Sequence, residues 1–246
     1  LQIASDIASQ QRQVAESTRQ FLMTLTKVPD VRNQDISASN RTFRELLKEN
    51  PLYADIFTTN ADGLILSSGR SFVPYSVRER KYFKDIHRTH SYAVGEYIVG
   101  GITKRSVLPF AYPIMGNDGK INGEVVAGVD LQRYGDLFSG ARLPAGSELV
   151  LTDHRGMRLF TRPENEKHAG TTDVPDIFKL MSGDNDEGTF TATGVDGLER
   201  LYAYKSLRLS DNEAPYLFIR ISIPKKTALA PHRKLFFRNF TAIGFA

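Results

Sequence analysis

The stretch "PFAYPIMGNDGKINGEVVAGVDL" (residues 109–131) decides the fold of this chain. Two largely apolar runs flank the turn residues Asn117, Asp118 and Gly119. Apolar runs on either side of an Asx-Gly turn are typical of a β-hairpin. Upstream, "ADIFTTNADGLILSSG" (54–69) has the same strand, turn and strand order, and "VRERKYFKDIH" (77–87) predicts a short helix. Together these segments predict an antiparallel sheet with a helix on one face.

The same order of elements returns further along the chain. A strand, turn and strand read as "SELVLTDHRGMRLFTRP" (147–163), a short helix as "VPDIFKLMSGD" (174–184), and a hairpin and closing strand follow. Corresponding residues keep a constant offset, since Thr58 to Leu151 is 151 − 58 = 93 and Gly95 to Gly188 is 188 − 95 = 93. A constant offset indicates duplication. We therefore predict an α+β fold with two tandem antiparallel-sheet subdomains.

Residues 1–28 precede these units and predict one long helix. Apolar residues recur at intervals of three and four, and no proline occurs before Pro29. The stripe is rich in small residues, among them Ala4, Ala8 and Ala15. Two interpretations stay open: a helix packed on its own domain, or a parallel stalk that forms a homodimer. A second helix is predicted from Asn40, a good cap residue, to a point before Pro51.

Composition excludes several classes of protein. The 246 residues are 41% hydrophobic, enough for a real core, and the net charge is only +4. An excess this small and dispersed argues against a nucleic-acid-binding face. With no cysteine there is neither a disulfide framework nor a zinc–thiolate site. The end, "KLFFRNFTAIGFA" (234–246), becomes apolar and reads as the first turns of a membrane span.

No motif points to an enzyme, a metal or a cofactor. Among the five histidines only His87 and His90 are close, and nothing near them completes a metal set. The Gly100-Gly101 loop lacks the frame of a P-loop, and no Gly-x-Ser-x-Gly elbow occurs. A hydrolase with a triad assembled from distant loops is the rival class. A structural or adhesive module is a third.

The order of elements and two stretches resemble the double Cache (PDC) sensor domain, built of two PAS-like sheets behind a long helix. The stretches are "RERKYFKDI" (78–86) and the 109–131 segment. The resemblance implies a long helix and second helix in residues 1–50 and a membrane-distal, ligand-binding subdomain in 51–140. It also implies a membrane-proximal subdomain in 141–224, and a C-terminal helix that runs into a truncated transmembrane span in 225–246.

The resemblance also implies a function. Such domains are the extracytoplasmic, here periplasmic, sensors of membrane-bound receptors, flanked by spans in the inner membrane. A sensor histidine kinase is the leading expectation, and a diguanylate cyclase or chemoreceptor is the alternative. This domain is then not itself an enzyme, and its partner is a small carboxylate or an amino acid.

The candidate ligand-binding residues are Tyr75, Arg80, Tyr82, Tyr97, Tyr112 and Asp130. An arginine fork holds a carboxylate through two hydrogen bonds, and phenols add donors. Amino-acid-binding members of the family have the pattern Tyr-x4-Arg-x-Trp-Tyr, a later Tyr and a final Asp. Tyr75 and Arg80 fit that pattern, whereas Tyr82 and Phe83 replace its Trp and Tyr. Tyr97 falls near the later Tyr, and Asp130 fits the Asp, where it would meet the amine of a ligand that has one.

Each candidate also has a structural interpretation. Arg80 could form a surface ion pair with Glu79 or Asp85, and Asp130 could cap the next helix. The aromatic residues Tyr82, Tyr97 and Tyr112 could complete a core. The second copy has "DVPDIF" (173–178) in place of Arg-Lys-Tyr-Phe, with no cation. That asymmetry favours one binding sheet and one transmitting sheet.

Overall fold

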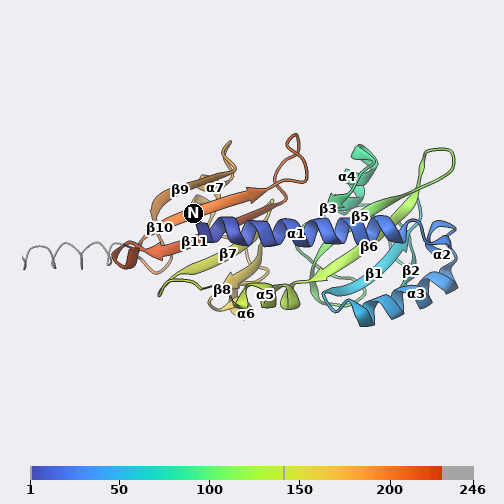
Figure 1. Ribbon diagram of the computed structural model, residues 1–246, viewed down its shortest axis with the longest axis horizontal. Helices are drawn as coiled ribbons and strands as arrows, with labels where there is room; N and C mark the ends of the chain where they lie inside the picture. The colour runs from blue at the N-terminus through green and yellow to red at the C-terminus, as the bar shows by residue number, and fades with distance from the viewer. Residues whose placement is uncertain (1, 141, 229–246) are drawn as a thin grey trace, which may run out of the picture.

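The computed structural model describes residues 2–140 and 142–228 of the chain. A single long helix, α1 (Gln2–Leu25), runs beside two antiparallel sheets that follow one another along its length (Figure 1). The predicted α+β fold with two tandem sheets is confirmed.

The first sheet contains the stretch that decided the fold. Its strands are β1 (Tyr53–Thr59), β2 (Ile65–Ser68), β3 (Ala93–Val94), β4 (Ile98–Val99), β5 (Ser106–Met115) and β6 (Ile121–Asp130). The strand order is β2-β1-β6-β5-β3, and β4 pairs with β5. The hairpin β5–β6 pairs from Val107 with Asp130 to Met115 with Ile121, closed by the predicted turn. The last strand therefore lies at the centre of the sheet, beside the first.

The second sheet repeats this topology. Its strands are β7 (Glu148–Asp153), β8 (Arg158–Arg162), β9 (Glu187–Thr193), β10 (Glu199–Leu207) and β11 (Leu217–Pro224), in the order β8-β7-β11-β10-β9. The first turns of the two sheets match in detail. In one, Asn60 Oδ1 accepts hydrogen bonds from the N–H groups of Asp62 and Leu64. In the other, Asp153 Oδ1 accepts from Arg155 and Met157, which supports duplication.

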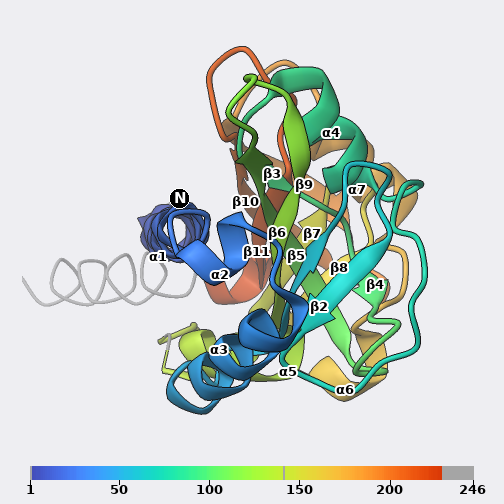
Figure 2. The same ribbon diagram turned by 90° about the vertical axis from the view of Figure 1, so that its right-hand side faces the viewer.

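The remaining helices cover the two faces of the sheets unequally. They are α2 (Pro29–Arg32), α3 (Ile36–Glu49), α4 (Lys81–Thr89), α5 (Leu131–Ser139), α6 (Asn165–His168) and α7 (Pro175–Met181). Seen along the long axis, α1 and α3 lie on one side of the sheets, and α4 and α7 lie on the other (Figure 2). The main core lies under α1, and smaller cores lie under α4 and α7.

The apolar stripe of α1 packs on the chain's own sheets. Ala4, Ala8 and Ala15 are buried, and the Tyr92 hydroxyl donates to the carbonyl of Ala15 over 2.8 Å. Thr18 shares a hydrogen bond of 3.1 Å with the Tyr53 hydroxyl. The structure therefore shows α1 packed on its own domain, which is the first of the two interpretations. The small residues of the stripe allow the helix to approach the chain's own strands closely. A homodimer through residues 1–28 stays a prediction, without support from that stripe.

The second predicted helix begins earlier than expected. Asp35 rather than Asn40 caps α3, and its Oδ1 accepts from the N–H of Ala38 over 2.9 Å. The side chain of Asn40 instead accepts from the N–H of Ser68 over 2.7 Å, which ties α3 to β2. Asp35 and Asn40 have the same capping chemistry and lie close together in the sequence. The contact of Asn40 with β2 leaves Asp35 as the cap. The predicted end before Pro51 is confirmed, since α3 ends at Glu49.

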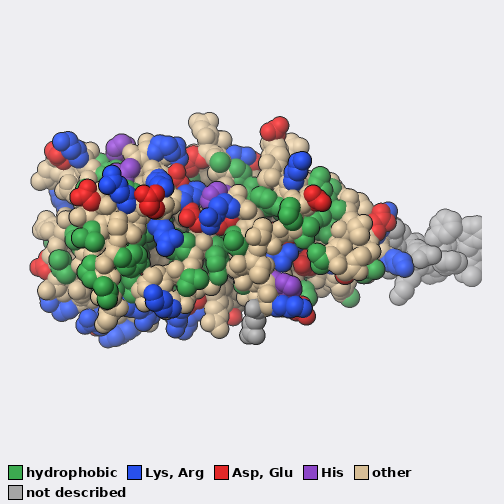
Figure 3. Space-filling model, turned by 180° about the vertical axis from the view of Figure 1, so that it is seen from behind, with side chains coloured by type: hydrophobic (Ala, Val, Ile, Leu, Met, Phe, Trp, Pro, Cys, Tyr) green, Lys and Arg blue, Asp and Glu red, His purple; other side chains and the backbone are tan. Residues whose placement is uncertain are grey.

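The surface is mixed in character. Figure 3 shows acidic, basic and apolar side chains interspersed over the face opposite to that of Figure 1, with a row of basic groups along one edge of the first-sheet end. Exposed Arg41, Arg44 and Lys48 lie on α3. Among residues 2–140 and 142–228 no helix has the length and apolar character to cross a membrane. The predicted span falls in residues 229–246, outside the described residues.

Candidate functional site

A cavity opens on the face of the first sheet that α1 does not cover. It encloses about 430 Å³ between its lining atoms, part of it open to solvent. Its floor includes Ala54, Asp55 and Phe57 of β1 and Gly128 of β6. Its walls include Tyr75, Val77, Arg80, Tyr82 and residues of the 98–103 segment. We call it the first-sheet cavity. The part of this space that a water-sized sphere can enter is only about 30 Å³, so the cavity is narrow in this conformation and suits a small molecule rather than a macromolecule.

Three of the six predicted site residues line this cavity: Tyr75, Arg80 and Tyr82. The sequence separates them by a loop and the start of α4. The chain brings them together because the 75–77 segment returns along β2, where Ser76 bridges to Leu64 and Val77 donates to the carbonyl of Gly63 over 2.8 Å.

Arg80 stands at the start of α4 in extended conformation and makes no side-chain cap. The acids proposed as its surface partners are engaged elsewhere. Glu79 pairs with Lys84 at 2.8 Å, and Asp85 pairs with both Lys81 and Arg88. Within the described part of the chain, the guanidinium of Arg80 has no hydrogen bond or ion pair. An arginine that lines a cavity without a partner is open to an anionic ligand.

The two tyrosines offer neutral hydroxyl groups beside Arg80. Burial raises the pKa of Tyr75, although the charge of Arg80 opposes that shift. Burial also raises the pKa of Tyr82 well above its usual value, since its side chain is almost wholly enclosed. Both phenols therefore keep their protons at physiological pH and can donate to a carboxylate. Tyr75 also packs on Gly101, where any Cβ would lie 2.6 Å from its ring.

The cavity contains one functional candidate that the sequence analysis missed, Asp55. Its carboxylate is buried in β1, and Ser68 Oγ lies 3.0 and 2.9 Å from its two oxygens. The N–H of Ile56 donates to Oδ1 over 2.8 Å. Burial raises the pKa of Asp55 to about 7. A signal was present, because an acid inside the apolar run "YADIF" is costly to bury unless it has a role.

The other three predicted residues lie outside the lining of the cavity. Asp130 caps α5 by accepting from the N–H of Gln132 over 3.1 Å, and it pairs with Arg105 Nη1 at 2.8 Å. Tyr112 is half-buried against the core on the α1 side of the sheet. The hydroxyl of Tyr97 shares a hydrogen bond of 2.8 Å with Ser106 Oγ.

Tyr97 also contacts the second sheet. Its N–H donates to Asp153 Oδ2 over 3.0 Å, and its hydroxyl packs on Gly170. The residue therefore joins the two sheets. Its position in the sequence gave no indication of that, because Asp153 is 56 residues away.

A second buried carboxylate lies under α4. Glu124 of β6 is fully enclosed, and neither of its oxygens has a hydrogen-bond partner within the described chain. The nearest basic group is His87 Nε2 on α4, 3.8 Å from Oε1. Burial raises the pKa of Glu124 to about 8 and lowers the pKa of His87. The pair is therefore neutral at pH 7, with a protonated acid beside an uncharged imidazole.

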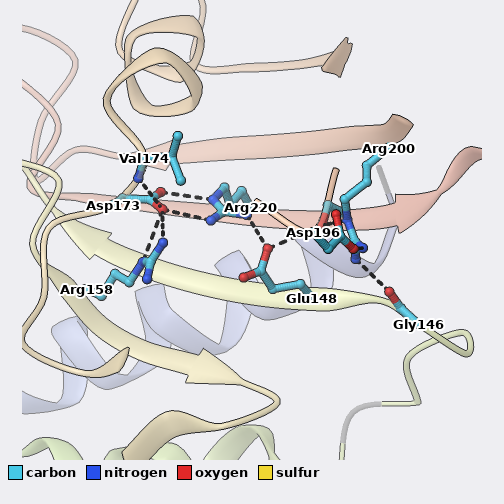
Figure 4. Close-up of polar contacts among 9 residues, drawn as sticks. Gly146, Glu148, Arg158, Asp173, Val174, Asp196, Arg200 and Arg220 are labelled. Atoms are coloured by element: carbon cyan, nitrogen blue, oxygen red, sulfur yellow. Dashed lines mark hydrogen bonds and ion pairs between the residues drawn. The ribbon is translucent and has the colours of Figure 1, made fainter. Parts of the chain in front are cut away.

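The corresponding face of the second sheet holds a buried ion-pair network in place of free polar groups (Figure 4). Arg220 of β11 donates to Asp173 through Nε at 2.9 Å and Nη2 at 2.8 Å. Its Nη1 donates to Glu148 of β7 over 2.8 Å. Arg158 of β8 completes the network with a contact of 2.9 Å to Asp173. Every charge here has a partner, in contrast to Arg80 of the first sheet.

Comparison with known proteins identifies the same architecture. A family model described as "Cache domain" matches residues 1–231. The ligand-binding domain of the Pseudomonas aeruginosa PAO1 amino acid chemoreceptor PctB, solved in complex with L-Gln, superposes with a TM-score of 0.67 at 17% identity, covering 93% of this chain and 91% of that one. The sensor domain of the V. cholerae histidine kinase DctB gives a TM-score of 0.63 at 17% identity, with coverage of 91% and 95%.

Two further matches complete the comparison. The periplasmic sensory domain of the Campylobacter jejuni chemoreceptor Tlp1 gives a TM-score of 0.65 at 12% identity over 94% of this chain and 95% of that one. A curated protein, ribosomal RNA large subunit methyltransferase H of Verminephrobacter eiseniae, is 33% identical over 81 residues. That match covers 33% of this chain and about half, 48%, of the curated protein, which is too little to assign a family.

Proposed function

Because this chain belongs to the Cache domain family, whose members are sensor domains, we propose that its first-sheet cavity binds a small carboxylate or an amino acid. The observation that carries the proposal is the guanidinium of Arg80, which lines the cavity beside two protonated phenols and has no partner in the described chain. A carboxylate would accept from Arg80 through two hydrogen bonds, with Tyr75 and Tyr82 as further donors. The complex of PctB with L-Gln supports this ligand class.

The proposal includes the setting of the domain. We place it on the extracytoplasmic side of the cell inner membrane, in the periplasm, as the sensor of a membrane-bound receptor. A sensor histidine kinase is the leading receptor class, and a chemoreceptor or diguanylate cyclase is the alternative. The histidine kinase and chemoreceptor domains that share the fold support this range. The output domain encoded by the full-length gene decides among them.

Binding would act through differential affinity. A ligand shifts a conformational equilibrium only if it binds one state more tightly than the other. The segments 75–82 and 98–103, which carry wall residues of the first-sheet cavity, would close on the ligand. Tyr97 precedes the 98–103 segment, and its N–H donates to Asp153 of the second sheet. Movement of that segment would therefore be transmitted to the second sheet.

The test is calorimetric titration of organic acids and amino acids into the wild type and an Arg80→Ala variant. A charge-assisted hydrogen bond contributes about 1.5–3 kcal/mol, so the variant should bind about tenfold to a hundredfold more weakly. Arg78→Ala is the matched control, because Arg78 is exposed and does not line the cavity. Equal affinity of wild type and Arg80→Ala for the best ligand would show that the site is elsewhere.

A further inference from the structure

We propose that Asp55 forms a cation-binding end of the first-sheet cavity, so that the ligand carries an ammonium group as well as a carboxylate. This inference rests on the proposed role of Arg80 at the other end. It replaces Asp130, which the sequence analysis named for the amine, with a residue of β1. The ligand class that follows is a small zwitterion, such as an α-amino acid, rather than a simple organic acid.

The Asp55 carboxylate has acceptor positions that no group of the described chain fills. A carboxylate has about four acceptor positions. Those of Asp55 receive only the N–H of Ile56 and the single proton of the Ser68 hydroxyl. The nearby cation, Arg70, directs its Nε to the carbonyl of Ala54 over 2.6 Å, and within the described chain Asp55 has no ion pair. The side chain is nevertheless only 5% exposed.

A structural role alone does not account for this arrangement. An asparagine would accept from Ser68 and Ile56 equally well and would avoid the cost of burying a charge. That cost is visible in the pKa of Asp55, which burial raises to about 7. A ligand ammonium group would supply the missing countercharge and let the carboxylate ionise fully.

The charges of the residues that line the cavity also favour a zwitterion. Within the described chain, the lining holds one cation without a partner, Arg80, and one carboxylate without an ion pair, Asp55, which the charge of Arg70 attracts without pairing. Tyr75 and Tyr82 remain neutral at pH 7, because burial raises both of their pKa values. A simple carboxylate would leave Asp55 without an ion pair and would favour its protonated form, because two neighbouring carboxylates repel one another. A zwitterion satisfies both ends.

Asp130 is already engaged through both oxygens of its carboxylate. Its Oδ1 accepts from the N–H of Gln132, and its Oδ2 pairs with Arg105 at 2.8 Å. Both oxygens therefore have partners, and Asp130 does not line the cavity. Gly128, two residues earlier on the same face of β6, lies directly across from Asp55 in the strand register. Gly128 lines the cavity together with Asp55, and a Cβ at Gly128 would meet Val107 at ordinary contact distance.

The experiment uses matched ligands with the whole domain. Each of the twenty L-amino acids is titrated beside its deaminated carboxylic acid and its decarboxylated amine, in a calorimeter. The wild type should bind at least one amino acid and should bind both of its truncated analogues at least tenfold more weakly. Asp55→Asn should weaken binding of that amino acid at least tenfold and change binding of the deaminated acid less than threefold. Asp62→Asn, an exposed acid in the β1–β2 turn, is the control and should change neither.

The outcomes separate this inference from the proposed function. If the best ligand depends on Arg80 but binds equally well without its amine, Asp55 has no such role and the function of Arg80 stands. If no ligand in the panel depends on Arg80, both proposals fail. The comparison of matched ligands on the wild type alone decides the question, so a folding defect in Asp55→Asn, checked by thermal unfolding, does not obscure it.

Proton release gives a second readout. An ammonium group next to Asp55 lowers its pKa, so binding near pH 6.5 should release part of a proton and binding near pH 8.5 should release none. The facing phenols of Tyr75 and Tyr82, whose pKa values burial raises, keep their protons throughout that range, and the other charged groups near Asp55 are the guanidinium groups of Arg70 and Arg80. Titrations in buffers with different ionisation enthalpies measure the proton count. A release that persists unchanged in Asp55→Asn would overturn the assignment.

Discussion

Asp55 and Glu148 occupy the same position in the two sheets of this chain. Their offset is 148 − 55 = 93, the offset of the repeat, and each lies on the first strand of its sheet next to the central last strand. Glu148 accepts from Arg220 Nη1 over 2.8 Å, whereas Asp55 forms no ion pair within the described chain, although the charge of Arg70 acts to lower its pKa. The equivalent positions therefore both carry a carboxylate, but only the carboxylate of the second sheet has an ion-pair partner within the described chain. In the second sheet an arginine of the chain itself supplies what we propose the ligand supplies in the first.

Removal of Arg220 should destabilise the protein severely. Arg220→Ala leaves Asp173 buried without its main partner, and breaking a buried ion pair on one side costs about 3–5 kcal/mol. Unfolding by urea measures the free energy. Lys225→Ala is the control, since Lys225 and Glu199 form an exposed pair whose loss should cost less than about 1 kcal/mol. Similar losses in the two variants would contradict the network shown in Figure 4.

Glu124 should make stability fall as the pH rises. Its pKa in the folded protein is about 8, above the ordinary value of 4.5, so the folded state holds a proton that the unfolded state has released. The stabilisation by the neutral acid is fully present below about pH 4.5 and is lost progressively up to pH 8. Glu124→Gln should flatten this dependence and raise the unfolding midpoint at pH 8. Thermal unfolding between pH 5 and 9 measures both, and an unchanged slope in the variant would refute the assignment.

Asp130→Ala should lower stability without affecting the choice of ligand. The variant loses the cap of α5, which is worth about 0.5–2 kcal/mol, and the ion pair with Arg105. Denaturant unfolding checks the first effect. Binding of an amino acid and of its deaminated analogue should change by the same factor. Selective loss of the amine-bearing ligand would instead restore Asp130 as the amine partner.

Tyr97→Phe should act on the joint between the sheets. The substitution removes the hydrogen bond with Ser106 Oγ, worth about 0.5–1.5 kcal/mol, and keeps the backbone contact with Asp153. We expect a small fall in the unfolding midpoint and less than a twofold change in ligand affinity. Asp153→Asn, which weakens the backbone contact, should reduce the cooperativity of unfolding between the sheets. A tenfold loss of affinity in Tyr97→Phe would place the phenol in the binding site after all.

The sequence predicted the fold well because its signals are local. Turn residues such as Asn60 and Asp153 fix their own loops by hydrogen bonds to the next few residues. The hairpin signals and the repeat offset then predict the two tandem antiparallel sheets. The predicted start of α3 was wrong because Asp35 and Asn40 have equal capping chemistry. Only the contact of Asn40 with Ser68 shows that Asn40 has another role and that Asp35 is the cap.

The site was harder to predict because it depends on which face a strand residue occupies. The Tyr75 to Tyr82 segment reaches the cavity through a local loop, and a motif could indicate it. Asp55 enters through the register between β1 and β6. Tyr97 forms a hydrogen bond with Ser106, and Asp130 forms an ion pair with Arg105. Neither partner could be predicted from the spacing of residues in the sequence.

The first turn of α1 and the last strand of the second sheet lie at the same end of the molecule (Figure 1). Gln2, Ile3 and Ala4 share an apolar groove with Ile221 and Ile223 of β11. Because the start of α1 and the strand β11 lie close together, the whole domain, here called the cassette, can be inserted into a single loop of a host protein. The two points where it would join the host are its junctions. Grafts that preserve the spacing between these junctions should fold independently of the recipient, and a recipient with an easily measured output would then report what this cassette detects.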